Sequence, residues 1–187
     1  MGRLPDLVLT IGHSNRSAED FLNLLEAHQV KRLADVRKMP RSRANPQFNF
    51  DALANTLGEH DIEYTAMPDL GGLRRPQPDS PNTGWKNKSF QAFADFMLTP
   101  AFEANVEELI ALAASRRTAI MCAEAVPWRC HRSLIADALV VRGIEVAHIM
   151  TATRLQPHVL HSWARVEGTR ITYPPEAETP DPQSRLF

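Results

Sequence analysis

The sequence of 187 residues contains only two cysteines, Cys122 and Cys130. Two cysteines do not build the disulfide framework that stabilises small secreted domains, so we expect a reducing, cytoplasmic compartment. No apolar run reaches the roughly 20 residues of a membrane-spanning helix, and the N-terminus lacks the basic-then-apolar pattern of a secretory signal. The sequence therefore predicts no membrane partner.

An excess of charge of one sign is also absent, because the formal net charge is −1. This balance excludes a uniformly basic coat for nucleic acid but leaves room for a local basic patch. A hydrophobic content of 43% in a chain of this length indicates one globular domain with a substantial core.

Short apolar runs alternate with helical patterns along the chain. Strands are expected at residues 7–11, 32–36, 62–67, 118–121 and 145–150. Helices are expected after Ser17, over 51–60, 89–98 and 101–115, and in the segment that ends at Gly143. This alternation predicts that residues 1–172 form a single-domain, doubly wound α/β fold. Its mainly parallel sheet would have about five strands, with helices on both faces.

The last residues, 173–187, are rich in proline and acidic side chains and predict a flexible tail. The tail ends in "QSRLF", which resembles the short peptide that binds bacterial polymerases and repair proteins to the replicative sliding clamp. Gln183, Leu186 and Phe187 would be the anchors in the clamp groove. The alternative is a fraying terminus without a partner.

Polar residues gather where the predicted strands end. His13 follows the first strand, Asp35 lies at the end of the second, Gly71 and Gly72 follow the third, and Glu124 follows the fourth. The turns at the opposite edge of the sheet carry little of note. Because open α/β sheets bind ligands at the carboxyl ends of their strands, we expect the functional site at this edge.

Glu124 is the first catalytic candidate. A carboxylate just beyond a buried strand and beside Trp128 would be partly desolvated, which suits general acid–base work. Asp35 would be the second carboxylate, and Arg132, near the start of the next helix, would hold a phosphate or carboxylate. Two structural alternatives stay open: Glu124 pairs with Arg132, and Asp35 pairs with Arg37. His13 is a further catalytic or ligand-binding candidate, and its structural alternative is a hydrogen-bonding role in the fold.

Cations and aromatic residues near the same edge favour a ligand that bears phosphate. Phosphate contacts are expected from Arg37, Arg41 and Arg43, with a solvated basic loop as the alternative. The long segment 68–88 contains Arg74 and two glycines, and predicts a flap that closes over an anionic ligand. Trp85 or Trp128 could stack a base.

The two cysteines leave several interpretations open. Cys122, Cys130 and His131 lie close in sequence, but a structural zinc site needs four ligands and would have to recruit His13. We therefore expect no metal or other cofactor. Cys122 precedes Arg129 by one residue too many for a cysteine-phosphatase loop. The remaining alternatives are inert packing of the thiols and a small-molecule enzyme that uses Cys122 or Cys130.

Four stretches carry a family resemblance, and they cover residues 7–150 in order: "TIGHSNRSAEDFLNLL", "LADVRKMPRSR", "YTAMPDLGGLRRP" and "MCAEAVPWRCHRSLIADAL". They resemble the domain-of-unknown-function 488 family. The resemblance implies a compact α/β domain and marks motif positions at His13, Asp35, Arg37, Gly71, Glu124, His131 and Arg132. Suggested activities for the family, base excision or nuclease-like cleavage, point to nucleic acid.

We therefore expect a nucleic-acid- or nucleotide-directed hydrolase linked to DNA repair or replication. Glu124 would be the general base or acid with Asp35 as second carboxylate, and His131, Arg37 and Arg132 would hold phosphate or stabilise charge. Two alternatives remain: a non-catalytic DNA-associated adaptor that binds the clamp, and the cysteine-dependent small-molecule enzyme.

Overall fold

The computed structural model describes residues 5–175, and six strands of this range form one sheet with the order β3-β2-β4-β1-β5-β6. The first five strands pair in parallel, as the sequence predicts, and β6 adds an antiparallel edge that was not expected. A separate two-stranded sheet joins β7 to β8. The strands are β1 (Leu7–Gly12), β2 (Arg32–Asp35), β3 (Glu63–Ala66), β4 (Thr118–Cys122), β5 (Glu145–Thr151), β6 (Arg154–Pro157), β7 (Arg165–Glu167) and β8 (Arg170–Thr172).

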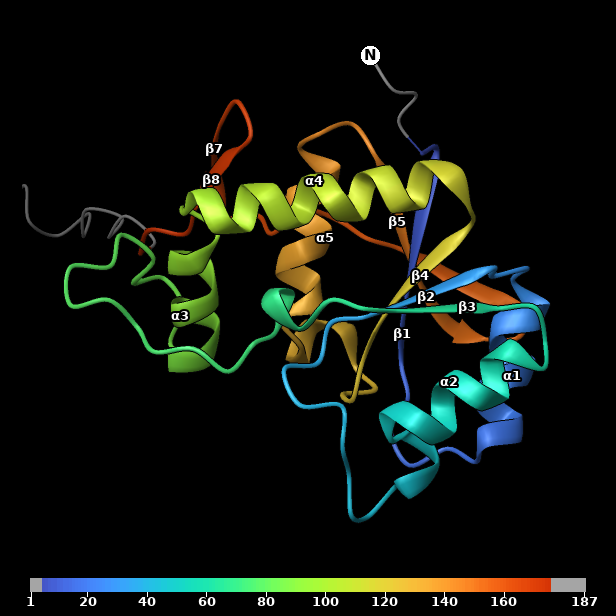
Figure 1. Cartoon of the computed structure of the whole chain (residues 1–187). Helices are drawn as coiled ribbons and strands as arrows, with labels where there is room; N and C mark the ends of the chain where they lie inside the picture. The colour runs from blue at the N-terminus through green and yellow to red at the C-terminus, as the bar shows by residue number, and fades with distance from the viewer. Residues whose placement is uncertain (1–4, 176–187) are drawn as a thin grey trace, which may run out of the picture.

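Helices cover both faces of the six-stranded sheet (Figure 1). Leu25 of α1 and Leu53 of α2 belong to the buried cluster of one face, and Phe93, Val106 and Leu134 bring α3, α4 and α5 into that of the other. The helices are α1 (Ala18–Ala27), α2 (Phe50–Gly58), α3 (Lys88–Phe96), α4 (Pro100–Ser115) and α5 (Arg132–Val140). The prediction of a doubly wound α/β fold is confirmed.

The neighbouring strands β1 and β4 mark the point where the winding of the sheet reverses. The chain leaves β1 through α1 toward β2, and it leaves β4 through α5 toward β5, in the opposite direction along the sheet. Gly12 and Cys122, the last residues of the two strands, are paired in register. At such a switch point, loops separate to opposite faces and open a crevice beyond the carboxyl ends of the strands.

The segment 68–88 is anchored to the domain rather than free to close as the predicted flap. The buried Asp95 of α3 accepts hydrogen bonds from the backbone N–H of Gln77 at 2.9 Å, from the Ser80 hydroxyl and from the Asn82 side chain at 2.8 Å. Trp85 packs against Phe90, Trp163, His161 and Tyr173. Trp85 is therefore a partly buried packing residue of this aromatic group, and it lines neither of the cavities described below.

A second buried carboxylate, Asp137 of α5, holds the C-terminal part of the described chain. It accepts hydrogen bonds from the Tyr173 hydroxyl at 2.6 Å, from His158 Nε2 at 2.7 Å and from His161 Nδ1 at 2.6 Å. Burial raises the pKa of Asp137, but the bonds from the two histidines outweigh it, and the pKa lies below the ordinary value.

Tyr173 is fully buried, so the folded domain extends past the predicted boundary at residue 172. The tail therefore cannot begin at residue 173, because the Tyr173 ring is part of the core. Three predicted clamp anchors, Gln183, Leu186 and Phe187, lie outside the described residues. Within residues 5–175, no helix is both long and apolar enough to cross a membrane.

The buried His148 of β5 predicts how stability depends on pH. Its ring bonds to the Thr10 hydroxyl at 2.6 Å and to His158 at 3.0 Å. Burial, together with the charges of His158 and Arg132, lowers the pKa of His148 from 6.5 to about 3. The unfolded chain therefore binds more protons than the folded chain between these values, so stability is lost as the pH falls below 6.5.

Urea unfolding at pH 7.5 and pH 5.0 tests this expectation. From pH 7.5 to pH 5.0, the free energy of unfolding of the wild type should fall by about 1–2 kcal/mol more than that of His148→Gln, since 1.4 kcal/mol corresponds to about one pKa unit. The exposed His60 supplies the control, and His60→Gln should follow the wild type. Parallel pH curves for the wild type and His148→Gln would show that His148 is not the group responsible.

Candidate functional site

Two adjoining cavities open at the carboxyl ends of β1, β2 and β4. The first, here the cysteine cavity, has a volume of about 470 Å³ and is lined by Cys122, Cys130 and His131 among others. The second, here the arginine cavity, has a volume of about 550 Å³ and is lined by His13 and Arg41 among others. Arg37, Met39, Ala123 and Glu124 line both cavities and form their common wall.

The end of β1 lies in direct contact with the loop after β4. The N–H of His13 donates to the carbonyl of Cys122 at 3.0 Å, and the N–H of Ser14 donates to that of Ala123 at 2.8 Å. A Cβ atom on Gly12 would lie 1.9 Å from the carbonyl oxygen of Glu124. Only glycine permits this approach, because real Cβ atoms do not come within 3.0 Å of other heavy atoms.

Arg132 holds the same loop from the other side. Its buried guanidinium donates to the carbonyl oxygen of Glu124 at 2.5 Å and to that of Ala125 at 2.9 Å. The side chain is 1% exposed and lines neither cavity. The predicted role of Arg132 as a phosphate ligand is therefore wrong, and the predicted pairing of its side chain with the Glu124 carboxylate is replaced by bonds to backbone carbonyls.

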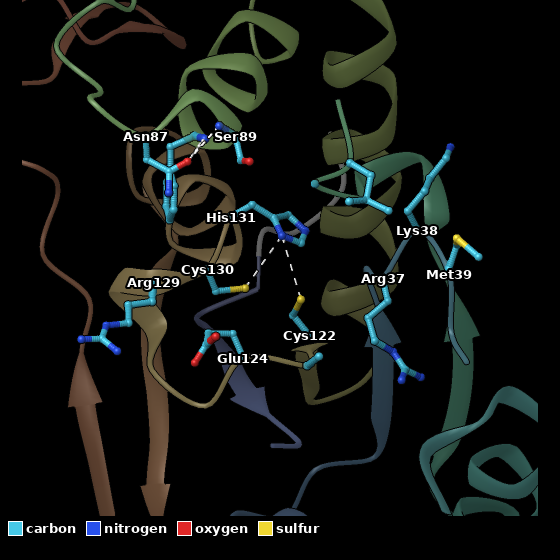
Figure 2. A pocket seen from close by; sticks show the side chains of 14 residues that line it. Arg37, Lys38, Met39, Asn87, Ser89, Cys122, Glu124, Arg129, Cys130 and His131 are labelled. Carbon is cyan, nitrogen blue, oxygen red and sulfur yellow. Dashed lines mark hydrogen bonds between the residues drawn. The ribbon is translucent and has the colours of Figure 1, made fainter. Parts of the chain in front are cut away.

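Cys122, Cys130 and His131 form a compact group inside the cysteine cavity (Figure 2). Nδ1 of His131 lies 3.9 Å from the Cys122 sulfur and 3.8 Å from the Cys130 sulfur, and the three atoms all lie within 4.8 Å of one another. Both cysteines are free thiols. Cys122 is the last residue of β4, and Cys130 and His131 lie in the turn before α5. A strand and a helix of the core therefore hold the group in place.

The two sulfur atoms differ in their proton affinity. A hydrogen bond from Cys130 lowers the pKa of Cys122 well below that of an ordinary thiol; burial opposes this shift, and His131 adds to it. The same bond, together with burial, raises the pKa of Cys130. Cys122 is therefore the sulfur atom of this pair that favours the thiolate form, in which cysteine acts as a nucleophile or binds metals.

Gly72 lies against His131 and lines the cysteine cavity, and its predicted contact with a ligand stays a prediction. A Cβ atom there would lie 2.8 Å from Nδ1 of His131, so glycine leaves the space beside this nitrogen free. Gly71 has a different role from the predicted ligand contact. It is buried, and a Cβ atom would lie 2.7 Å from the Cβ of Lys38. Gly71 thus permits the chain after β3 to pack on the loop after β2.

Asp35 and Arg37 form a buried ion pair at the end of β2, which was the structural alternative. Nε and the terminal amino group of Arg37 donate to the two carboxylate oxygens at 2.9 Å and 2.6 Å, and the Tyr64 hydroxyl donates at 2.6 Å. Asp35 is 1% exposed, so it is not a second catalytic carboxylate. Arg37 also donates to the backbone carbonyl of Phe48 at 2.8 Å. Most of its guanidinium is thus already occupied.

His13 is bound on both ring nitrogens. Nδ1 lies 2.7 Å from the Ser14 carbonyl, to which it donates, and Nε2 lies 3.2 Å from Arg37, from which it accepts. The ring stacks on Phe48 with 4.3 Å between centroids. Burial, with the charge of Arg37 acting in the same direction, lowers the pKa of His13. These contacts favour the structural alternative, although the ring lines the arginine cavity.

Glu124 has an exposed side chain on the common wall of the two cavities. The expected desolvation by Trp128 is absent, because Trp128 is 57% exposed and lines a different cavity with His148 and His158. Trp128 is therefore not a stacking residue of this site. Glu124 lines the cysteine cavity together with Cys122 and Cys130 (Figure 2), and its exposed carboxylate is open to a ligand or water there.

The predicted cations divide into residues that reach the cavities and residues that do not. Arg41 lines the arginine cavity. Arg43 is exposed but lines neither cavity. Arg74 lies over the Phe96 ring at 3.2 Å and donates to the backbone carbonyls of Gly71 and Asp69, so it is a packing residue rather than a phosphate ligand.

Sequence reasoning missed several residues of the cysteine cavity. Arg129, Asn87 and Ser89 line this cavity, together with Lys38 from the basic loop after β2. Arg129 was considered only for its spacing from Cys122, and the signal that could have found it is its place in the turn between β4 and α5. Asn87 and Ser89 begin α3 and come from a segment about 35 residues earlier in the chain, which only the fold brings to β4.

These features define a doubly wound α/β protein with a thiol-containing cavity at its switch point. A family model described as "Domain of unknown function DUF488" matches residues 17–139, which is more than half of the chain, and the protein belongs to this family. The match includes the ends of β2 and β4 but not His13. No curated protein and no solved structure matches the chain.

The contact of Gly12 with the loop after β4 predicts a sharp stability effect. Gly12→Ala should lower the free energy of unfolding by about 3 kcal/mol or more, because the new methyl group meets backbone atoms that cannot move aside. Gly58→Ala is the matched control, since a Cβ atom there meets nothing within 4 Å. Urea unfolding measures both, and equal stability of the two variants would contradict the packing at Gly12.

Proposed function

We propose that the protein is a hydrolytic enzyme that acts on a phosphate-bearing substrate, a nucleotide or a nucleic-acid strand, in the two joined cavities. The observation that carries the proposal is the place of Glu124 on the wall that both cavities share. A general base must lie within hydrogen-bond reach of a water and of the substrate, and an exposed carboxylate in a concave site meets this requirement.

Cations at the cavities support a phosphate-bearing substrate. Arg41 lies in the arginine cavity and Arg129 in the cysteine cavity, and neither makes an ion pair within residues 5–175. Lys38 has a pairing with Asp69 at 3.4 Å, and both side chains are largely exposed, so a phosphate competes easily for this cation. Glu124 is the only acidic residue among those that line the two cavities.

The catalytic role of Glu124 has a direct test. Glu124→Gln keeps the shape of the side chain but removes the proton acceptor, so it should lower the hydrolysis rate about 100-fold or more and leave the unfolding midpoint unchanged. The substrates are nucleoside monophosphates and a mixed-sequence single-stranded oligonucleotide, with released base, phosphate and cleaved strand detected by mass spectrometry. Glu145→Gln, at the opposite edge of the sheet, is the control and should retain the wild-type rate.

Loss of activity with Glu145→Gln as well, or full activity in Glu124→Gln, would refute the assigned role. If none of these substrates gives a product, the support for a hydrolase is removed and the adaptor alternative remains.

Binding of the sliding clamp by Gln183, Leu186 and Phe187 stays a separate proposal. A pull-down of the clamp by the wild type and by the double variant Leu186→Ala, Phe187→Ala tests it.

Single substitutions of Arg41 and Arg43 distinguish a phosphate contact inside the arginine cavity from non-specific binding by a basic loop. Arg41→Ala should weaken binding of the oligonucleotide and reduce the slope of its salt dependence by about one, because one phosphate contact is lost. Arg43→Ala removes the same charge two residues away, outside the cavities, and should change the slope little. Fluorescence anisotropy over a series of salt concentrations measures both. Equal effects of the two variants would show that the loop binds without using the arginine cavity.

A further inference from the structure

The group of Cys122, Cys130 and His131 has the geometry of ligands around a common centre. In a tetrahedral zinc site, with Zn–S of about 2.3 Å and Zn–N of about 2.0–2.1 Å, sulfur and nitrogen are about 3.6 Å apart. The two sulfur-to-nitrogen distances here are 3.9 Å and 3.8 Å. Each differs from the tetrahedral value by only about 0.2–0.3 Å, a change that small side-chain rotations supply.

The surroundings of His131 direct its ring toward this centre. Nε2 is buried and has no hydrogen-bond partner among the described residues, so the polar contacts of the ring are the two sulfur atoms at Nδ1. A nucleophilic Cys–His pair would need one sulfur at this nitrogen, and the second sulfur at nearly the same distance would have no role. Gly72 leaves the space beside Nδ1 free of side-chain atoms.

We propose that Cys122, Cys130 and His131 bind a zinc-type divalent cation at the base of the cysteine cavity. Two sulfur atoms and one imidazole favour a soft or borderline metal such as zinc over magnesium or calcium. The site has three protein ligands, and all three residues line the cavity. A fourth position therefore faces the cavity, which is the arrangement of catalytic zinc sites rather than structural ones.

The second group of possible ligands, Asp137, His158 and His161, has a different character. Its carboxylate oxygens already accept bonds of 2.6 Å and 2.7 Å from the two histidines, and the Tyr173 hydroxyl adds a third. A cation there would have to break all three bonds. In the cysteine cavity a cation would displace only the proton that Cys130 shares with Cys122, and both sulfur atoms lie 3.8–3.9 Å from Nδ1 of His131.

Glu124 completes the chemistry, and this part of the inference rests on the proposed hydrolytic function. A bound cation lowers the pKa of a water in its open position. Glu124 lines the same cavity and can take one proton from that water, so that one O–H bond breaks and hydroxide remains for attack on the substrate. Zinc deaminases of nucleobases have a comparable order, with a ligand two residues before the glutamate and later ligands after a proline. Here Cys122 likewise precedes Glu124 by two residues, whereas Cys130 lies three residues after Pro127 and is followed by His131 instead of a second cysteine.

Metal binding is measured without any activity assay. The full-length protein is reduced under argon, stripped with a chelator and titrated with Co²⁺, which replaces Zn²⁺ and reports its ligands by absorption. The expected result is one cobalt ion per chain, with the near-ultraviolet band of thiolate-to-cobalt charge transfer and the visible bands of tetrahedral cobalt. Adding one equivalent of Zn²⁺ should abolish these bands.

Variants assign the ligands. Cys122→Ser and Cys130→Ser should each weaken the charge-transfer band, and the double variant should lose it. His60→Gln, a substitution of an exposed histidine elsewhere, should keep the wild-type spectrum, and so should Glu124→Gln, because Glu124 is not a ligand. Circular dichroism of each variant verifies folding. A wild-type protein with two titratable thiols and no cobalt band would overturn the inference, and so would a full band in the double variant.

The outcomes separate this inference from the proposed function. A cobalt band without hydrolysis of any nucleotide substrate would retain the metal site and reject the hydrolase. Hydrolysis that continues at the same rate after removal of the metal, with no cobalt band, would retain the hydrolase and reject the metal site. Loss of hydrolysis after chelation, with recovery on adding Zn²⁺, supports both.

Discussion

The contact between Gly12 and the loop after β4 is the constraint on which the site depends. The backbone at Gly12 lies so close to the Glu124 carbonyl that no side chain fits between them. The bonds from His13 and Ser14 to the carbonyls of Cys122 and Ala123 extend the pairing of β1 and β4 beyond the sheet. The loop is therefore part of the rigid core, and the side chains that leave it have defined directions.

Arg132 extends this constraint to the helix that follows. Its buried guanidinium binds the carbonyls of Glu124 and Ala125, which have no strand partner to satisfy them. A buried charge is costly unless hydrogen bonds compensate it, so the contact ties the start of α5 to the loop. The start of α5 lies beside Cys130 and His131, and this tie brings them to Cys122. The arrangement of Cys122, Cys130 and His131 in the cavity thus depends on one glycine and one arginine that do not line it.

Three of the carboxylates described above show how the surroundings decide the role of a side chain. Asp35 is saturated by Arg37 and Tyr64, and Asp137 by two histidines and Tyr173. Each holds segments of the chain together, because a buried carboxylate must find donors. Glu124 is exposed at a cavity wall, where its oxygens are open to a ligand or water. Nothing in the sequence around these residues distinguishes the saturated carboxylates from the open one.

The sequence by itself determined the α/β class, the order of strands and helices along the chain and the edge of the sheet at which the candidate site lies. These follow from local hydrophobic periodicity and from the geometry of parallel sheets. Only the tertiary structure decided which polar residues of that edge are free. Arg37 is occupied by Asp35, Arg74 by Phe96 and backbone carbonyls, and Arg132 by a loop. The side chains of Arg37, Arg74 and Arg132 meet their partners only when strands, helices and loops pack, even where a partner lies a few residues away in sequence. The approach of Cys122 to His131, nine residues apart, has the same origin.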